Sequence, residues 1–196
     1  MLVWYIARGA GLAALVLLTA SICLGALMSG RVSARPDARV ITQYTHRFVA
    51  TVALAVLGLH IAMILADSFA HVSFVGAVVP FSAQYRPLWV GLGTIAAYCM
   101  VLSATTGYLR RRLAGSPRAA AIWRVLHGTA YAGWALAMLH GLRSGTDAHV
   151  GWVRWLYLGC LAAVVLSATV RFMAATPRDE DRLVGTHRDA ARAVAR

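Results

Sequence analysis

The sequence predicts an all-α integral membrane protein, a bundle of five transmembrane helices with its N-terminus outside and its C-terminus in the cytoplasm. Of the 196 residues, 60% are hydrophobic and only 13% are charged, which lies outside the usual range for a soluble globular domain. A helix of about 20 apolar residues crosses the ~30 Å hydrocarbon core of a bilayer. Five segments are long enough to do so: 2–28, 45–66, 88–109, 123–142 and 152–173.

The arginines predict the orientation of these segments. Every basic side chain of the chain is an arginine, and fifteen of the nineteen follow the first, third and fifth segments or flank the start of the next segment. The other four, Arg8, Arg86, Arg143 and Arg154, lie near the opposite ends. Because arginine-rich loops stay in the cytoplasm, the second and fourth segments are expected to run parallel, from the cytoplasm outward. The net charge of +12 is thereby explained without a nucleic-acid partner, since no continuous basic stripe exists.

One membrane domain, residues 1–173, and a short charged cytoplasmic tail, residues 174–196, are expected. The first segment has no basic residues ahead of its apolar run and no A-x-A site, so we expect it to be retained rather than cleaved as a signal peptide. The external linker 67–87 is mostly apolar and is expected to lie against the membrane or to cap the bundle. No repeat period is evident. We expect a multi-pass protein of the plasma membrane, in contact with lipid.

Four of the seven histidines lie inside two of the predicted spans. His46 and His60 are fourteen residues apart in the second span, and His127 and His140 are thirteen apart in the fourth. Ionisable groups inside a bilayer mark functional sites by default, although a neutral imidazole can also simply bond to a neighbouring helix. At ~1.5 Å per residue, each spacing covers about 20 Å along the helix axis. Each helix therefore offers one histidine near each membrane surface.

Pairing His46 with His127, and His60 with His140, gives two bis-imidazole sites, one above the other. This is the ligation expected for two six-coordinate b-type haems with iron bound by imidazole on both sides. The absence of a neighbouring carboxylate or thiolate argues against zinc or a di-iron site. Thirteen residues leave His127 and His140 about 140° apart on an ideal helix. The fourth span is therefore expected to be tilted, wrapped around its neighbour or locally distorted, for example by a π-bulge.

Several arginines are candidate partners for haem propionates, which they could bind through charge-assisted hydrogen bonds. Arg47 and Arg124 lie beside the inner pair of histidines, and Arg8 and Arg86 lie at the outer side. Ordinary positive-inside anchoring is the alternative for each. The remaining histidines, His71, His149 and His187, are expected at the solvated surface. The tryptophans near span ends are expected to form interfacial belts.

The three cysteines, Cys23, Cys99 and Cys160, lie in three different apolar segments with no metal-ligand spacing. Neither a disulfide framework nor a zinc site is predicted from them. They are expected to pack as small hydrophobic residues.

Several stretches resemble the ferric reductase-like transmembrane domain family. They are "WYIARGAGL" in the first span, "HR" and "LGLH" in the second, "VPFSAQYRPLWVGLG" leading into the third, "WRVLH" and "LH" in the fourth, and "HGLRSGTD" after it. The family includes the membrane cores of NADPH oxidases and ferric reductases, and the haem-binding subunit of the bacterial methionine sulfoxide reductase system. The likeness covers most of residues 4–147.

This resemblance implies a bundle that holds two b-haems on the four histidines and relays electrons outward. The donor would be cytoplasmic or in the membrane, and the external acceptor would be ferric iron, a flavoprotein or a repair reductase. No GxGxxG or other nucleotide-binding unit is present in the sequence, so flavin is expected only on a partner protein, and a flavoprotein or a quinone is expected to supply the electrons. No acid–base catalytic residue is predicted, because the haem carries the chemistry.

Two other functions are compatible with the same residues. One is a non-redox assembly or scaffold subunit whose histidines only join helices. The other is a proton-coupled transporter that uses the histidines as relay groups. The lack of an intramembrane acidic residue and of proline-broken helices disfavours the transporter.

Overall fold

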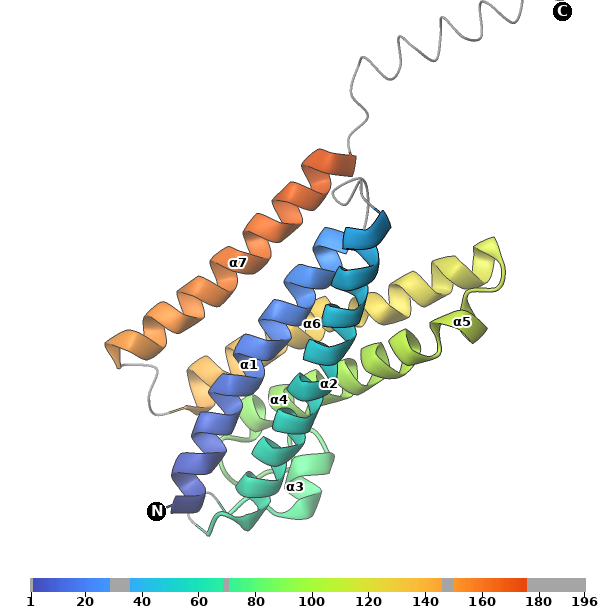
Figure 1. Ribbon diagram of the computed structural model, residues 1–196. Coiled ribbons are helices and arrows are strands. Elements are labelled where there is room, and N and C mark those ends of the chain that lie inside the picture. Colours follow the sequence, from blue (N-terminus) through green and yellow to red (C-terminus); the bar gives the residue numbers. More distant parts are fainter. Residues whose placement is uncertain (1, 29–35, 69–70, 146–149, 176–196) are drawn as a thin grey trace, which may run out of the picture.

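The computed structural model describes residues 2–28, 36–68, 71–145 and 150–175, and within these ranges the protein is helical with no strand. Five long helices and two short ones follow one another along the chain (Figure 1). They are α1 (Leu2–Met28), α2 (Pro36–Ala66), α3 (Phe74–Val78), α4 (Pro87–Tyr108), α5 (Arg110–Leu113), α6 (Pro117–Ser144) and α7 (Gly151–Ala175). The all-α prediction is confirmed, and most of the predicted tail lies outside the described residues.

In the described part of the chain, four helices are long and apolar enough to cross a membrane: α1, α2, α4 and α7. The sequence predicted a fifth span, 123–142, and that segment lies within α6, which has 28 residues. Helix α6 is therefore long enough, but it is less apolar than the other four. Two histidines and three arginines interrupt its apolar sequence. The chain is a membrane protein by its apolar helices, and the count of five spans rests on α6.

Proline and serine residues define where several helices begin. Helices α2, α4 and α6 each start with a proline, which has no N–H to leave unbonded in the first turn and a backbone angle already suited to a helix. Ser116 precedes α6, and its hydroxyl accepts a hydrogen bond from the Ala119 N–H at 3.2 Å. Ser73 caps α3 in the same way, with the Gly76 N–H at 3.1 Å. These local signals mark where the helices begin, and two of these helices, α2 and α6, carry the four histidines.

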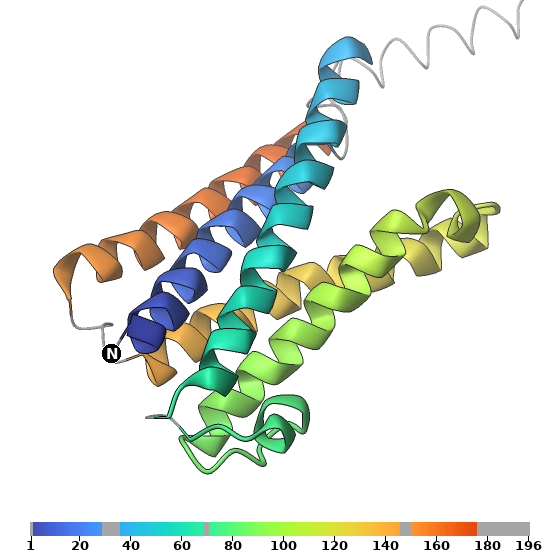
Figure 2. The ribbon, with the colours of Figure 1, turned by 60° about the horizontal axis from the view of Figure 1, so that its bottom comes forward.

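The long helices form two antiparallel hairpins with α7 added at one side. Helix α1 packs closely along α2, and α4 packs closely along α6. Helix α7 lies against α1, on the face away from α2 (Figure 1). Figure 2 shows the α4–α6 hairpin inclined to α1 and α2, so that the two hairpins diverge toward the end where α2 begins. Direct packing between α2 and either helix of the other hairpin is sparse.

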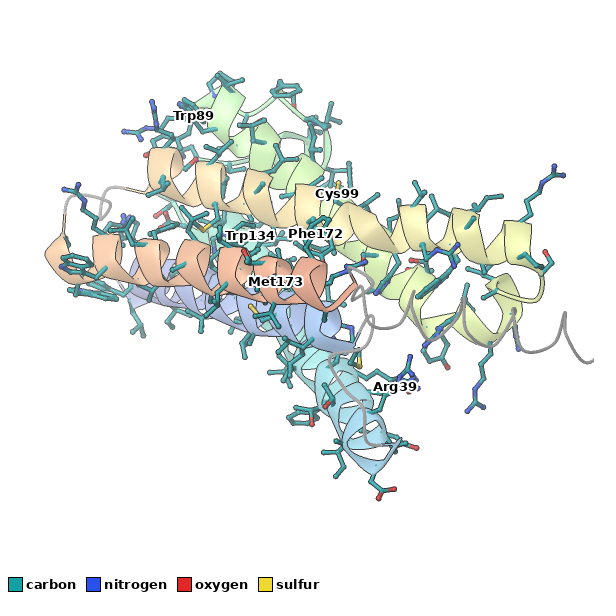
Figure 3. The ribbon with its side chains drawn as sticks, turned by 90° about the horizontal axis from the view of Figure 1, so that it is seen from above. Arg39, Trp89, Cys99, Trp134, Phe172 and Met173 are labelled. Atoms are coloured by element: carbon teal, nitrogen blue, oxygen red, sulfur yellow. The ribbon has the colours of Figure 1, made fainter. Side chains whose placement is uncertain are left out.

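The hairpins meet in an apolar core near the middle of their length. Trp134 of α6 is 6% exposed and Ala53 of α2 is fully buried, and both belong to this core together with Leu15, Leu18 and Met100. The indole N–H of Trp134 donates to the Thr19 hydroxyl of α1 at 2.9 Å. Figure 3 shows Trp134 in the interior of the bundle, between α6 and the layer formed by α1 and α7. Trp134 therefore ties the second hairpin to the first.

The linker between α2 and α4 covers one end of the bundle. Its short helix α3 packs on α4, and Val72 and Ala83 are both 5% exposed. Three of its residues have a positive φ angle, His71, Phe81 and Arg86, which is an uncommon conformation for residues other than glycine. The chain thus turns tightly enough to close this end of the bundle.

Candidate functional site

The structure brings the four predicted histidines together as two pairs. The ring centres of His46 and His127 are 6.3 Å apart, and those of His60 and His140 are 6.4 Å apart. The ring planes are nearly perpendicular within each pair, at 77° and 75°. We call His46 with His127 the first pair and His60 with His140 the second pair. The pairing predicted from the sequence is the pairing found in the structure.

Each imidazole is held by a backbone carbonyl of the helix next to it. The Nδ1–H groups of His46 and His60 donate to Ser21 O at 2.9 Å and Ala7 O at 2.7 Å, both in α1. The Nδ1–H groups of His127 and His140 donate in the same way to carbonyls of α4. The acceptors are Ser103 O at 2.9 Å and Trp89 O at 2.8 Å. A hydrogen bond from one ring nitrogen fixes the tautomer and leaves the other nitrogen with a free lone pair. Among the described residues, every hydrogen bond to these four rings is made by Nδ1.

A glycine lies beside each of the four rings. A methyl group on Gly93 would come within 2.6 Å of His140 Nδ1, and one on Gly11 within 3.0 Å of His60 Nδ1. Gly107 and Gly25 stand in the same relation to His127 and His46, with closest approaches of 3.0 and 3.3 Å to Cε1. The edge of the ring that carries Nδ1 and Cε1 therefore faces the glycine. The remaining nitrogen, Nε2, is directed away from the supporting helix.

These glycines explain how the carbonyls are reached. Each acceptor carbonyl comes four residues before a glycine: Ala7 before Gly11, Ser21 before Gly25, Trp89 before Gly93 and Ser103 before Gly107. In an α-helix, the carbonyl of residue i accepts from the N–H of residue i+4, and the side chain of that residue would cover the approach to the oxygen. Without a side chain, the imidazole can share the carbonyl with the helix. A methyl group would clash with the ring at Gly93, and at the other three positions the ring would have to shift by a few tenths of an ångström.

Helices α1 and α4 carry this pattern at identical spacing, a repeat that was not expected from the sequence. The acceptor and glycine positions are 7, 11, 21 and 25 in α1 and 89, 93, 103 and 107 in α4, each shifted by 82 residues. Ser21 and Ser103 occupy equivalent positions, and each hydroxyl lies 3.3 Å from the Nδ1 atom of its histidine. The signal that could have found it is the recurring fourteen-residue glycine spacing, which equals the spacing of His46 and His60 and exceeds that of His127 and His140 by one residue.

The thirteen-residue step in α6 is accommodated without a break in the helix. Residues 117–144 are α-helical throughout, with no π-turn. Figures 1 and 2 show α6 crossing behind α1 and α2 at an angle. Two helices that cross present different faces to each other on the two sides of the crossing point. Tilt therefore accounts for the two pairs, and the expected alternative of a π-bulge is wrong.

A cavity of about 250 Å³ surrounds the second pair. Its lining is mostly apolar and comes from α1, α2, α4, α6, α7 and the linker 67–87, with Val72 and Ala77 contributed by the linker. Polar groups reach it at a few points, among them Arg8, Asp67 and Tyr85. A mostly apolar pocket with a few polar groups is the usual character of a cofactor or ligand site.

The candidate arginines are placed differently from one another. Arg8 lines the cavity of the second pair, with its guanidinium carbon 4.5 Å from the ring centre of Trp4. Arg47 and Arg124 are exposed, and the structure gives them no contact with the first pair. Arg86 donates from Nη1 to the Arg143 carbonyl. Of the four, Arg8 alone lines the described cavity.

Two neighbours of the histidine pairs were not identified as site residues in the sequence. Trp123, assigned to an interfacial belt, stacks on His127 with ring centres 5.2 Å apart and planes 12° apart. Its spacing of four residues from His127 was the available signal, since such residues lie on one face of a helix. Asp67 is only 9% exposed at the end of α2 and lines the cavity. It was missed because it falls one residue beyond the predicted span.

The other residues singled out in the sequence are three histidines and three cysteines. His71 is exposed, and His149 and His187 lie outside the described residues. The three cysteines are unpaired, with Cys160 buried and Cys23 and Cys99 half-buried. No group of three or more histidine, cysteine or acidic side chains in the described chain is arranged to bind a metal ion. Any metal held here would depend on two imidazoles and on ligands from another source.

The geometry of each pair can be compared with that of two imidazoles on one metal ion. With a metal–nitrogen bond of about 2.0–2.1 Å and about 1.1 Å from that nitrogen to its ring centre, two imidazoles on opposite sides of an ion have centres about 6.3 Å apart. The observed 6.3 and 6.4 Å fit this value. Hydrogen bonding of the second ring nitrogen to a backbone carbonyl is also the usual support of a metal-binding histidine.

Comparisons with known proteins found no matching family model, no similar curated protein and no similar solved structure.

Proposed function

We propose that the chain is a b-type membrane cytochrome that holds two haems and relays electrons across the membrane. The observation that carries this proposal is the doubled pair of imidazoles, with each Nδ1 bonded to a carbonyl and the ring centres 6.3 and 6.4 Å apart. A haem bound between two imidazoles supplies reversible one-electron chemistry. His46 and His127 would hold one group, and His60 and His140 the other.

The chain's own residues would position and insulate these groups. The four carbonyls and glycines orient the imidazoles, and the apolar lining around the second pair excludes water. Arg8 lines that cavity and is the arginine we assign to a haem propionate there. Arg47 and Arg124 are exposed, so we assign them to membrane anchoring, which is the alternative that the sequence left open.

In this proposal α6 is the fifth span, and the N-terminus lies outside the cell. Its length of 28 residues and its close packing along α4 support a transmembrane position despite its polar residues. The first pair then lies toward the cytoplasm and the second toward the exterior of the plasma membrane. Electrons would pass from a flavoprotein or quinone donor to an external acceptor such as ferric iron, a flavoprotein or a repair reductase. The same features are those expected of the ferric reductase-like transmembrane family.

Purification with haem supplied during expression tests the proposal. We expect two haems per chain and a low-spin spectrum of bis-imidazole type. His60→Ala with His140→Ala should halve the haem content, and His46→Ala with His127→Ala should remove the other half. A colourless protein, or an unchanged haem content in both double variants, would falsify the proposal.

A scaffold subunit is the second candidate, because carbonyl bonds between helices are also what purely structural histidines would form. Asparagine separates the two functions. Its side-chain amide N–H stands at about the same place as the histidine Nδ1–H, so it preserves the bond to the carbonyl but provides no Nε2. Asparagine at all four positions should leave a scaffold intact and should abolish haem binding in a cytochrome. Haem content and thermal unfolding of the four-asparagine variant decide between them.

A further inference from the structure

Trp123 makes the surroundings of the first pair different from those of the second. Its indole lies nearly parallel to the imidazole of His127, with ring centres 5.2 Å apart. Among the aromatic ring contacts of the described residues, this is the only one that joins an indole to any of the four imidazoles. Trp123 lies one helical turn from His127, on the side away from the middle of the bundle. The equivalent positions next to the other three histidines hold Thr42, Ile64 and Ser144. None of these can stack on a ring.

The indole is itself held on two sides. Its Nε1–H donates to the Thr106 carbonyl of α4 at 2.9 Å. The guanidinium carbon of Arg110 lies 5.0 Å from the centre of the indole, over its face. Arginine over tryptophan is an attractive cation–π arrangement. Arg110, Trp123 and His127 thus form a stack that begins at the exposed α4–α6 connection and ends at the first pair.

The stack adds a second constraint to a ring that is already bonded at its edge. The Nδ1–H bond to Ser103 O fixes one edge of the His127 ring, but rotation about the bond to the ring could still tilt its plane. An indole against one face opposes that tilt. We propose that Trp123, held by Arg110 and Thr106, is a positioning residue that fixes the ring plane of His127, and that the charge of Arg110, placed by the same indole, raises the reduction potential at the first pair alone. This inference rests on the proposed haem-binding function and deepens it.

The direction of the effect on potential follows from charge. Reduction adds one negative charge at the site, so a fixed positive charge nearby stabilises the reduced form and raises the potential. Arg110 provides such a charge, and hydrogen bonding and charge around a haem are established means of setting its potential. Arg110 is exposed, so water and salt screen its charge, and its loss should shift the one-electron equilibrium at the first site by about two- to threefold, which corresponds to roughly 20–30 mV. The second pair is on the far side of the core and should not respond.

The experiment uses two single-site proteins. His60→Ala with His140→Ala leaves only the first site, and His46→Ala with His127→Ala leaves only the second. Trp123→Leu and Arg110→Gln are introduced into both, and potentials are measured by redox titration, with EPR spectra as a record of the angle between the two imidazole planes. In the first-site protein, we expect Trp123→Leu to alter the EPR spectrum and Arg110→Gln to lower the potential. In the second-site protein, we expect neither change.

Matched variants separate the stack from general effects. Arg111→Gln removes an equal charge from the same exposed turn. It should change the potential by only a small fraction of the shift that Arg110→Gln causes. Arg110→Lys keeps the charge and should restore most of the potential. If Trp123→Leu fails to fold, Trp123→Phe keeps a stacking face without the Nε1–H bond, and its EPR spectrum should change less than a full loss of stacking would cause.

The outcomes distinguish this inference from the function on which it rests. If Trp123→Leu changes the EPR spectrum equally in the two single-site proteins, or in neither, the positioning role of Trp123 is overturned and the haem-binding function still stands. An Arg111→Gln shift as large as that of Arg110→Gln would also overturn it. Absence of haem from both proteins would overturn the proposed function itself.

Discussion

The α1–α2 hairpin and the α4–α6 hairpin hold their histidines by the same scheme, but the second holds them more tightly. The glycine contacts of the first hairpin would place a new methyl group 3.0 and 3.3 Å from the rings, against 2.6 and 3.0 Å in the second. Ser103 in α4 also donates to the His127 carbonyl at 2.8 Å, whereas the Ser21 hydroxyl, among the described residues, contacts only the ring of its histidine.

Each site therefore combines a more constrained imidazole, from α6, with a less constrained one, from α2. In both pairs, the α6 histidine has the closer glycine, and His127 has the stacked indole as well. The α2 histidine could then adjust to whatever lies between the two rings.

The largest expected effect comes from separating the hairpins at their shared core. Trp134→Ala removes a nearly buried indole and its bond to Thr19, and such a truncation costs about 3–5 kcal/mol in the free energy of unfolding. We expect a strong fall in thermal stability and loss of both haems together. Trp155→Ala is the control, because Trp155 is 74% exposed, and it should change the unfolding temperature little. Loss of only one haem from Trp134→Ala would contradict a shared core.

Next in size are the glycines beside the rings. Gly93→Ala places a methyl group 2.6 Å from His140 Nδ1, and forcing extra volume into a packed site costs about 1–3 kcal/mol. Gly25→Ala has a 3.3 Å contact and should cost less. Haem retention during dilution should therefore fall further for Gly93→Ala than for Gly25→Ala. The reverse order would show that the first hairpin is the more tightly built.

A smaller difference is expected for the two equivalent serines. Ser103→Ala removes the hydrogen bond to the His127 carbonyl as well as the contact with the ring, and a hydrogen bond contributes about 1 kcal/mol to stability. Ser21→Ala removes only the contact with His46. Thermal unfolding should show the greater loss for Ser103→Ala. Equal losses would mean that the extra bond contributes nothing.

The smallest expected effect concerns glycines that face open space. An added methyl group on Gly58 of α2 or Gly128 of α6 would have no neighbour within 4 Å. Alanine in place of glycine within a helix stabilises it by up to about 1 kcal/mol. Both variants should raise the unfolding temperature slightly and to a similar extent in the two hairpins. A marked loss from Gly128→Ala would indicate that a neighbour approaches this face of α6 in the folded protein.

The sequence was sufficient for the helices and for the histidine pairing. Apolar length predicted the bounds of α1 completely and those of α4 and α7 within two residues. It placed the start of α2 nine residues late, because residues 36–44 are too polar for a bilayer but helical all the same. The pairing of His46 with His127 followed from spacing and orientation, both of which can be read from one chain.

The rest depended on contacts between helices that spacing alone does not specify. Nothing near His140 in the sequence indicates that Gly93 lies against its ring, because 47 residues separate them. The tilt of α6 likewise depends on how the whole helix packs against α4 and α1. Trp123 could be placed on the His127 face of α6, but only the folded α4–α6 connection brings Arg110 over it.

Ala53 has a consequence for how the two sites respond to change. It is fully buried and lies seven residues from His46 and seven from His60, so it marks the midpoint of α2 between the two pairs. A small side chain lets α2 lie close against the core at a point equally distant from both sites, and a bulkier residue there would push α2 outward. The two imidazoles would then move apart within each pair, so one substitution midway along α2 would change both sites at once.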